Sequence, residues 1–171
     1  MRLKDLLNAK RTHIEGEFFK RTLSFYPEET ASVLATKSDP FSNPVGAIIR
    51  EATGAIVDGF LDESPVNRIA PAIEQIVRIR AVQDFTASEA VSFLFLFKQV
   101  IREELQPEAE DHELSADLDR LSSQLDELVL AAFNIYVACR DKITEIRLGE
   151  AQKERDRLLR VIQALTPSPR R

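Results

Sequence analysis

Apolar residues recur every three or four positions along most of this chain, which is the spacing of an amphipathic helix. Leu, Ala, Glu and Arg dominate the composition and favour helix, while β-branched residues rarely alternate with polar ones. Series with helical spacing cover residues 3–18, 45–60, 69–79, 90–101 and 118–139. The pattern therefore predicts an all-α bundle with a long C-terminal helix.

Two residue pairs that end in proline mark where helices begin. Asn43 can cap a helix, and Pro44 fits its first position because the N–H that proline lacks would be unpaired there. Ser64-Pro65 repeats this pattern, although Pro71 leaves the start of the regular helix anywhere between the two prolines. Both sites predict helices that pack their apolar faces into a core.

The helix that begins after Thr86 is apolar on almost every side. Thr86 and Glu89 form a T-x-x-E capping box, in which each side chain can bond the backbone N–H of the other residue. Val91 and Phe95 point away from the side that carries the other apolar residues. A helix of this kind is either central in the core or covered by a partner, so Val91 and Phe95 are candidate dimer contacts.

The last helical series is the longest and resembles the seam of a coiled coil. Its apolar residues follow one another at spacings of 3, 4, 3, 4, 3 and 4 over residues 118–139. Leu130, Phe133 and Val137 add a second apolar stripe to the same helix. Because a small domain rarely uses both faces of two helices internally, these three residues are further candidate dimer contacts.

After Leu148 the chain becomes highly charged but keeps an apolar stripe. This stripe can dock into the groove of a partner, or it can fold back on the core of its own domain. The helix either continues through Gly149 or breaks there. We expect a helical domain over residues 1–148 and a charged helix and tail over residues 149–171. The candidate docking residues are Leu158, Leu159, Ile162 and Leu165.

Composition and charge exclude several classes of protein. The 171 residues fit one domain with a real core, and 44% hydrophobic with 30% charged residues is ordinary for a globular protein. The net charge of −5 argues against general nucleic-acid binding. A single cysteine suits a reducing compartment, and no apolar run is long enough for membrane insertion. With no signal-peptide pattern at the N-terminus, we expect a cytoplasmic protein.

The chain offers little catalytic chemistry. His13 and His112 belong to no metal-binding motif. His112 falls in an acidic segment, residues 107–115, that we expect to be a loop. The sequence therefore predicts neither a metal site nor a haem ligand. No nucleophile elbow, phosphate-binding loop or dinucleotide-binding motif occurs. Cys139 lies on the apolar seam, where a thiol usually fills the core, and a redox role is the alternative. We expect no enzyme activity and no cofactor.

One polar cluster lies at the end of the helical series over residues 69–79. Arg80 and Asp84 are four residues apart, so their spacing predicts that they can pair on one face of this helix, with a backbone carbonyl as the alternative partner of Arg80. The favoured interpretation is an internal network that ties the helix to the DPFSNPVG turn, in which Asp39 and Asn43 are turn and cap residues. The alternative is an anion or effector site. The candidate cluster consists of Asp39, Asn43, Arg78, Arg80, Gln83 and Asp84.

Two segments carry a resemblance to a known family. DPFSNPVG at residues 39–46 and RIRAVQDFTASEAVSFLFLFKQVIR at residues 78–102 resemble the N-terminal domain of the RsbRD family, the RsbT co-antagonist proteins of bacterial stress signalling. The resemblance extends over residues 3–105, and over the final helix in pattern only. It implies the globin-like, non-haem fold of stressosome sensor domains, which dimerise and send a final helix into an output module.

The expected function follows from this resemblance. The chain ends at Arg171 without room for an output module, so we expect a non-catalytic signalling adaptor that regulates a partner protein in trans. A homodimer is expected as well. The alternative is a regulator that senses a small ligand or a redox signal, through the cluster of Arg78, Arg80 and Asp84 or through Cys139.

Overall fold

Helices account for all regular structure in the described part of the chain. The computed structural model describes residues 3–36, 40–105 and 112–165, and no strand occurs within these ranges. The predicted all-α bundle with a long C-terminal helix is therefore confirmed. Its elements are α1 (Leu3–Leu23), α2 (Glu28–Ala35), α3 (Pro44–Leu61), α4 (Val66–Val82), α5 (Ala87–Val91), α6 (Phe93–Leu105) and α7 (His112–Leu165).

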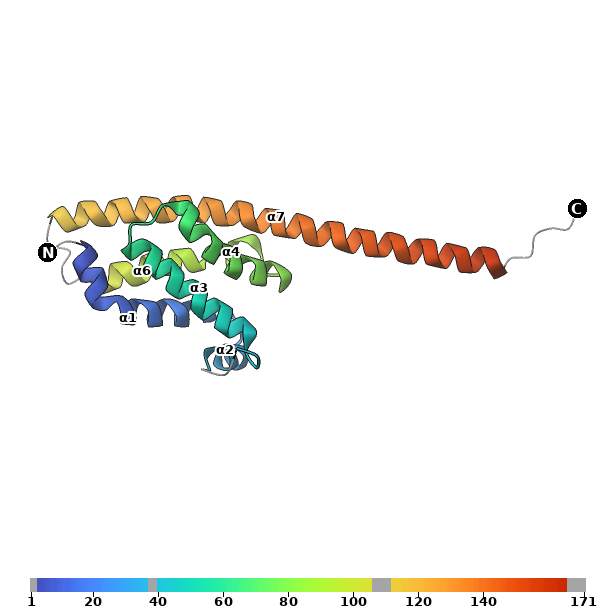
Figure 1. Ribbon diagram of the computed structural model, residues 1–171, viewed down its shortest axis with the longest axis horizontal. Coiled ribbons are helices and arrows are strands. Elements are labelled where there is room, and N and C mark those ends of the chain that lie inside the picture. Colours follow the sequence, from blue (N-terminus) through green and yellow to red (C-terminus); the bar gives the residue numbers. More distant parts are fainter. Residues whose placement is uncertain (1–2, 37–39, 106–111, 166–171) are drawn as a thin grey trace, which may run out of the picture.

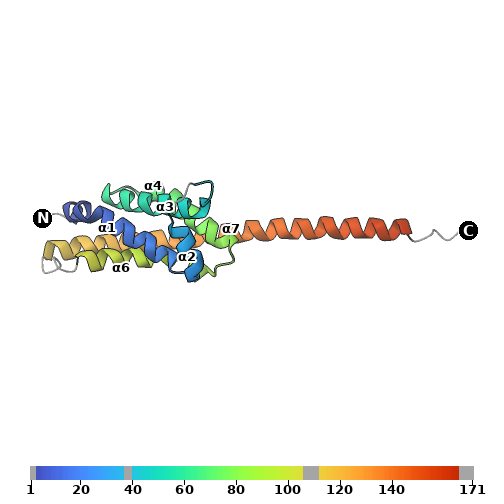
Figure 2. The ribbon, with the colours of Figure 1, turned by 90° about the horizontal axis from the view of Figure 1, so that it is seen from below.

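The long helix α7 runs beside the bundle along one half of its length and projects from it along the other (Figure 1). The shorter helices gather beside its N-terminal half, and Figure 2 shows the same arrangement from below. At 1.5 Å per residue, its 54 residues span roughly 80 Å. Residues 144–165 are exposed throughout, apart from the half-buried Gly149. We term residues 144–165 the arm, and the packed remainder the body.

Three aromatic rings meet at the centre of the body. Phe18 of α1 lies against Phe97 of α6 with 4.5 Å between the ring centroids, and Phe60 of α3 meets the same ring at 5.2 Å. Ring pairs of this kind add about 0.5–1.5 kcal/mol to the burial of the side chains. The seam of α7 closes the core from one side with Leu121, Leu125, Leu128 and Ala132, which are all buried.

Asn43 caps α3 as predicted and also ties it to α2. Its side-chain oxygen accepts the N–H of Gly46 at 3.0 Å, and Pro44 is the first helical residue. The amide nitrogen of the same side chain donates to the carbonyls of Val33 and Leu34, at 3.0 and 3.2 Å. These bonds bring α3 so close to α2 that a Cβ on Gly46 would lie 2.4 Å from the Leu34 carbonyl oxygen.

The start of α4 differs from the Ser-Pro pattern. The helix begins at Val66, and Pro65 precedes it without a side-chain cap. The N–H of Ser64 donates to the carbonyl of Gly59 at 2.8 Å, so Ser64 belongs to the end of α3. Pro71 lies inside α4 on its exposed side. The earlier of the two prolines therefore marks the helix start.

The capping box at Thr86 is confirmed, but the helix that it starts is divided. The N–H of Thr86 donates to the carboxylate of Glu89 at 2.9 Å, and its hydroxyl accepts the N–H of Glu89 at 3.4 Å. α5 ends at Val91, and α6 begins at Phe93. The hydroxyl of Ser92, between them, donates to the carbonyl of Glu89 at 2.8 Å. A serine that bonds the local backbone in this way competes with the helical hydrogen bonds, which accounts for the break.

The long helix extends beyond its predicted seam at both ends. It begins at His112, so residues 112–115 are helical. The prediction of a loop over residues 107–115 is therefore wrong for residues 112–115. Residues 106–111 and the side chain of His112 lie outside the described part of the chain. At the other end, α7 continues through Gly149 without a break.

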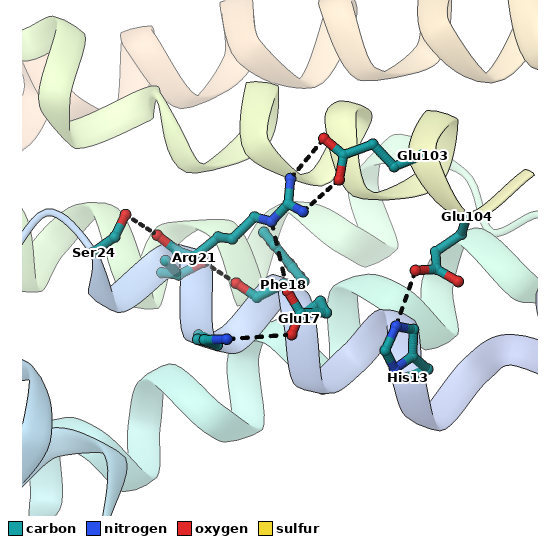
Figure 3. A network of polar contacts seen from close by, with 9 residues as sticks. His13, Glu17, Phe18, Arg21, Ser24, Glu103 and Glu104 are labelled. Carbon is teal, nitrogen blue, oxygen red and sulfur yellow. Dashed lines mark hydrogen bonds and ion pairs between the residues drawn. The ribbon is translucent and has the colours of Figure 1, made fainter. Parts of the chain in front are cut away.

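Polar contacts between side chains join α1 to α6 across the surface of the body (Figure 3). Arg21 donates to both carboxylate oxygens of Glu103, one of them at 3.1 Å. His13 lies 3.0 Å from the carboxylate of Glu104, and its side chain is mostly exposed. Exposed pairs of this kind contribute only about 0.2–1 kcal/mol, so they align the two helices while the core holds them together.

We predict that Gly46→Ala destabilises the protein by about 1–3 kcal/mol, because the added methyl group has no room between Asn43 and the carbonyl of Leu34. Gly16→Ala is the matched control. An added Cβ on Gly16 meets nothing within 4 Å, so alanine should stabilise α1 by about 0.5–1 kcal/mol. Urea unfolding followed by circular dichroism measures both variants. A stabilising effect of Gly46→Ala would contradict the close approach of α2 and α3.

Candidate functional site: a buried arginine and the turn that follows it

Arg80 is the largest of the fully buried side chains in the described part of the body. Helical spacing places it there, because Ile73, Ile76 and Val77 occupy the same buried face of α4 one or two turns earlier. The exposure of Arg80 is 0%, which is rare for an arginine and costly unless the guanidinium group is hydrogen-bonded. The partners of this group therefore decide its role.

The guanidinium group of Arg80 bonds to the carbonyl ends of two helices. Nη2 donates to the carbonyl of Thr22 at 2.8 Å, and Nη1 donates to those of Glu89 at 2.8 Å and Ala90 at 3.5 Å. Thr22 lies in the last turn of α1, and the other two residues lie in the last turn of α5. Such carbonyls lack a helical N–H to accept and carry the negative end of the helix dipole. The buried cation supplies the missing donors and joins both helices to α4.

Aromatic rings enclose the same guanidinium group. Its central carbon lies 4.9 Å from the ring centroid of Phe25, 5.2 Å from that of Phe93 and 5.4 Å from that of Phe85. Rings at these distances attract a cation through their electron-rich faces. Burial lowers the pKa of Arg80 to about 10, so the side chain keeps its charge at pH 7. The Nε atom has no hydrogen-bond partner among the described residues.

Asp84 does not pair with Arg80, contrary to the prediction from their spacing. α4 ends at Val82, and Asp84 has a left-handed backbone with a φ of 60°. The N–H of Phe85 donates to the carbonyl of Arg80 at 3.1 Å, a bond that closes helices with a left-handed residue just past their end. Because the helix has ended, a spacing of four no longer puts the two side chains on one face. We term residues 83–86, between α4 and α5, the junction turn.

Two arginines of α7 contact the carboxylate of Asp84 instead. Arg140 donates to it at 2.7 Å and also to the carbonyl of Ala81 at 3.0 Å. A terminal nitrogen of Arg147 lies 3.7 Å from the same carboxylate oxygen. The hydrogen bond from Arg140 and the charge of Arg147 lower the pKa of Asp84. The end of α4 is thereby joined to the long helix.

Tyrosine hydroxyl groups bind the junction turn from two sides. The hydroxyl of Tyr136, on α7, donates to the carbonyl of Phe85 at 2.6 Å. The hydroxyl of Tyr26, just after α1, donates to the side-chain oxygen of Gln83 at 2.8 Å. The sequence pattern alone does not single out Tyr136 or the role of Arg140. Their spacing of four, beside the seam of α7, is the signal that could reveal them.

The remaining members of the predicted cluster lie apart from Arg80. Arg78 is exposed and pairs with Glu74, one turn earlier on α4, at 2.9 Å. Asn43 belongs to the contact between α2 and α3, and Asp39 lies outside the described residues. The structure therefore divides the cluster: Arg80 connects α4 with α1 and α5, and not with the turn that holds Asn43.

The candidate dimer contacts fall into two groups. Val91 is 6% exposed because α5 packs against α4 and α7, so this side chain belongs to the core of its own chain and is not available to a second one. The others are between 41% and 69% exposed: Phe95, Leu130, Phe133 and Val137. The candidate docking residues of the arm are also exposed: Leu158, Leu159, Ile162 and Leu165.

Two surface hollows lie away from Arg80. One of about 430 Å³ lies between α6 and α7, and one of about 650 Å³ is lined chiefly by α1 and α3; neither is lined by Arg80. Cys139 is half-buried and packs against the core. Over the described side chains, no three His, Cys, Asp or Glu residues gather as a metal ion would require. The absence of a cofactor and of enzyme activity stays a prediction.

Comparison with known families identifies the chain. The sequence model of the RsbT co-antagonist protein rsbRD N-terminal domain matches residues 23–151. This chain belongs to that family. The family is one of regulatory domains in stress signalling, as the resemblance of residues 39–46 and 78–102 implies. The match covers the junction turn and α7 as far as residue 151, but it begins at Leu23 and so omits nearly all of α1, which the resemblance includes.

A relative of unknown function is also similar to this chain in sequence. An uncharacterized protein of Archaeoglobus fulgidus is 26% identical over 121 residues, which are 69% of this chain and 76% of that protein. No solved structure matches the chain. None of the helices within the described ranges is long and apolar enough to cross a membrane. The assignment of this RsbRD-family domain to regulatory signalling therefore rests on the family match.

We predict that Arg80→Met in this RsbRD-family domain lowers the free energy of unfolding by about 2–5 kcal/mol. Methionine leaves the buried carbonyl of Thr22 without its donor, at a cost of about 1–3 kcal/mol, and removes from the carbonyl of Glu89 a charge-assisted bond worth about 1.5–3 kcal/mol, although the Ser92 hydroxyl still donates there. Arg78→Met is the matched control, because its exposed pair with Glu74 is worth less than about 1 kcal/mol. Urea unfolding gives both values. Equal losses for the two variants would contradict the architectural role of Arg80.

We also predict that Asp84 makes stability depend on pH. Because its pKa is lowered in the folded state, the ionised carboxylate stabilises the fold above the unfolded value of 3.8, and this contribution is lost as the pH falls through the folded pKa. The wild type should therefore lose more stability on acidification than Asp84→Asn. Glu63→Gln is the control, because Glu63 has a similar left-handed backbone, with a φ of 51°, after α3. The measurement is the urea midpoint of unfolding at several pH values. If the midpoint depends on pH in the same way for the wild type and Asp84→Asn, the pairing of Asp84 with Arg140 and Arg147 is contradicted.

Proposed function

We propose that this domain is a non-catalytic signalling adaptor that binds a regulatory protein through the arm. The observation that carries this proposal is the exposure of a continuous helix over residues 144–165. Most of the stability of helices in proteins comes from packing of an apolar face against another surface, and the arm keeps an apolar stripe that is exposed. A partner that covers the arm would supply that packing.

An uncharged row along the outer face of α7 supports helix-to-helix binding. Every seventh residue from position 130 is apolar, small or a threonine, and all of them are exposed: Leu130, Val137, Thr144, Ala151, Leu158 and Leu165. A seven-residue repeat lets a second helix follow the first with a slight left-handed supercoil. The row therefore offers a continuous contact surface that begins beside the body and extends along the arm.

A second copy of the chain is the proposed occupant of the row beside the body. Leu130, Phe133 and Val137 leave large apolar surfaces exposed there, and Phe95 does so on α6. Full burial of one such side chain is worth about 1.5–3 kcal/mol, so covering several of them in each chain favours a homodimer. We propose residues 1–148 as the sensor domain and residues 149–171 as the segment that docks a partner in trans.

Sensing of a ligand or a redox signal has less support. The terminal nitrogens of Arg80 donate to carbonyls of its own domain, and the group is closed off from solvent. Cys139 packs against the core on the seam of α7. Both side chains are therefore better explained as parts of the fold than as receptors.

We predict that sedimentation equilibrium at micromolar concentration gives the mass of a dimer. Leu130→Glu combined with Val137→Glu should shift the protein to the monomer, because it places charges in the apolar part of the row. The control is Gln124→Glu combined with Gln152→Glu, which adds the same charge at exposed positions of α7 outside the row. A wild-type mass of 19.4 kDa would contradict the dimer.

A further inference from the structure

The junction turn is where the body last holds α7 before the arm begins. Tyr136 donates to the turn, and Arg140 donates to the turn and to the end of α4. Ile143, half-buried, follows one turn later, and Arg147 reaches Asp84 from the arm itself. The contacts of the turn therefore help to set the direction in which the arm leaves the body.

The other side of the junction turn is held by the interior of the body. The Tyr26 hydroxyl donates to Gln83 at 2.8 Å, and the Tyr26 ring lies 5.3 Å from the ring of Phe85. Phe85 in turn lies beside the buried guanidinium group of Arg80. A displacement at the end of α1 thus acts on the same four residues that hold α7.

Asp84 places a negative charge at the C-terminal end of α4. Its left-handed backbone is one that aspartate tolerates, but the dipole of the helix repels a negative charge at this end. The contacts with Arg140 and Arg147 offset the cost. Because these ion pairs are exposed, they are weak enough to open and re-form.

We propose that the junction turn is a latch through which the interior of the body controls the arm. While the Tyr26 hydroxyl is bonded to Gln83, the carboxylate of Asp84 stays in contact with Arg140 and Arg147. These contacts fix the base of the arm, where α7 leaves the body. When the turn is displaced, these pairs open and the base of the arm is released. Asp84 is the positioning residue of the latch. This proposal rests on the proposed function, since it takes the arm to be the binding element.

Hydrogen exchange of backbone amides in the full chain tests the latch. Asp84→Asn removes the charge while asparagine tolerates the left-handed backbone. We expect exchange over residues 140–150 to become roughly two- to fivefold faster, the change that one exposed ion pair produces. Exchange in α6 should stay the same, as should exchange over residues 140–150 in the control Glu63→Gln. A uniform increase across the body would show that Asp84 affects only global stability, and would overturn the proposal.

Tyr26→Phe tests the coupling from the other side of the turn. It removes only the hydroxyl that donates to Gln83, on the side of the turn opposite α7. A similar increase over residues 140–150, with no further increase in the double variant with Asp84→Asn, would support one shared latch. Unchanged exchange in Tyr26→Phe, or additive effects in the double variant, would overturn it. Since exchange is measured on the chain itself, failure here leaves partner binding by the arm untouched, and failure of partner binding leaves this result standing.

Discussion

A guanidinium group in an apolar core is tolerated only when its charge and its donors are matched. In this domain the matching groups are the carbonyl ends of α1 and α5, and the carbonyl of Thr22 would itself be buried without a donor. The cation and the two helix ends therefore stabilise one another. This constraint matters most for α5, which has only five residues and depends on Arg80 and on its capping box for its position. Because the junction turn directly precedes α5, the position of α5 also determines where the turn contacts α7.

The long helix combines two surfaces with different roles. Its seam, from Leu121 to Ala132, is buried and completes the core of the body. The uncharged row on its outer face begins at Leu130, where the seam is still in contact with the body, and continues to Leu165. A single continuous helix thus links the packing of the core to the surface that we propose for binding. We propose that changes in the interior of the body reach a partner through this helix.

Local features of this fold could be predicted from the sequence, and long-range polar contacts could not. The caps at Asn43 and Thr86 form within three residues, so their residue types reveal them. Arg80 is different, because its partners are backbone carbonyls that no side-chain pattern reports. The partner of Asp84 lies 56 residues away, and the left-handed turn that redirects its side chain is invisible in a spacing of four. The sequence cannot decide whether Val91 is buried in its own chain or contacts a second one, because a helix that is apolar all round is either central in the core or covered by a partner.

The central claim is that the segment after Leu148 lies outside the cooperative fold, which leaves it available for binding. Truncation after Leu148 tests it most directly, by comparison of the melting temperatures of the shortened and full-length chains. The account predicts an unchanged melting temperature, with a loss of helical signal that matches the removed residues. A shortened chain that unfolds at a clearly lower temperature, or aggregates, would show that the segment is part of the core and would contradict the account.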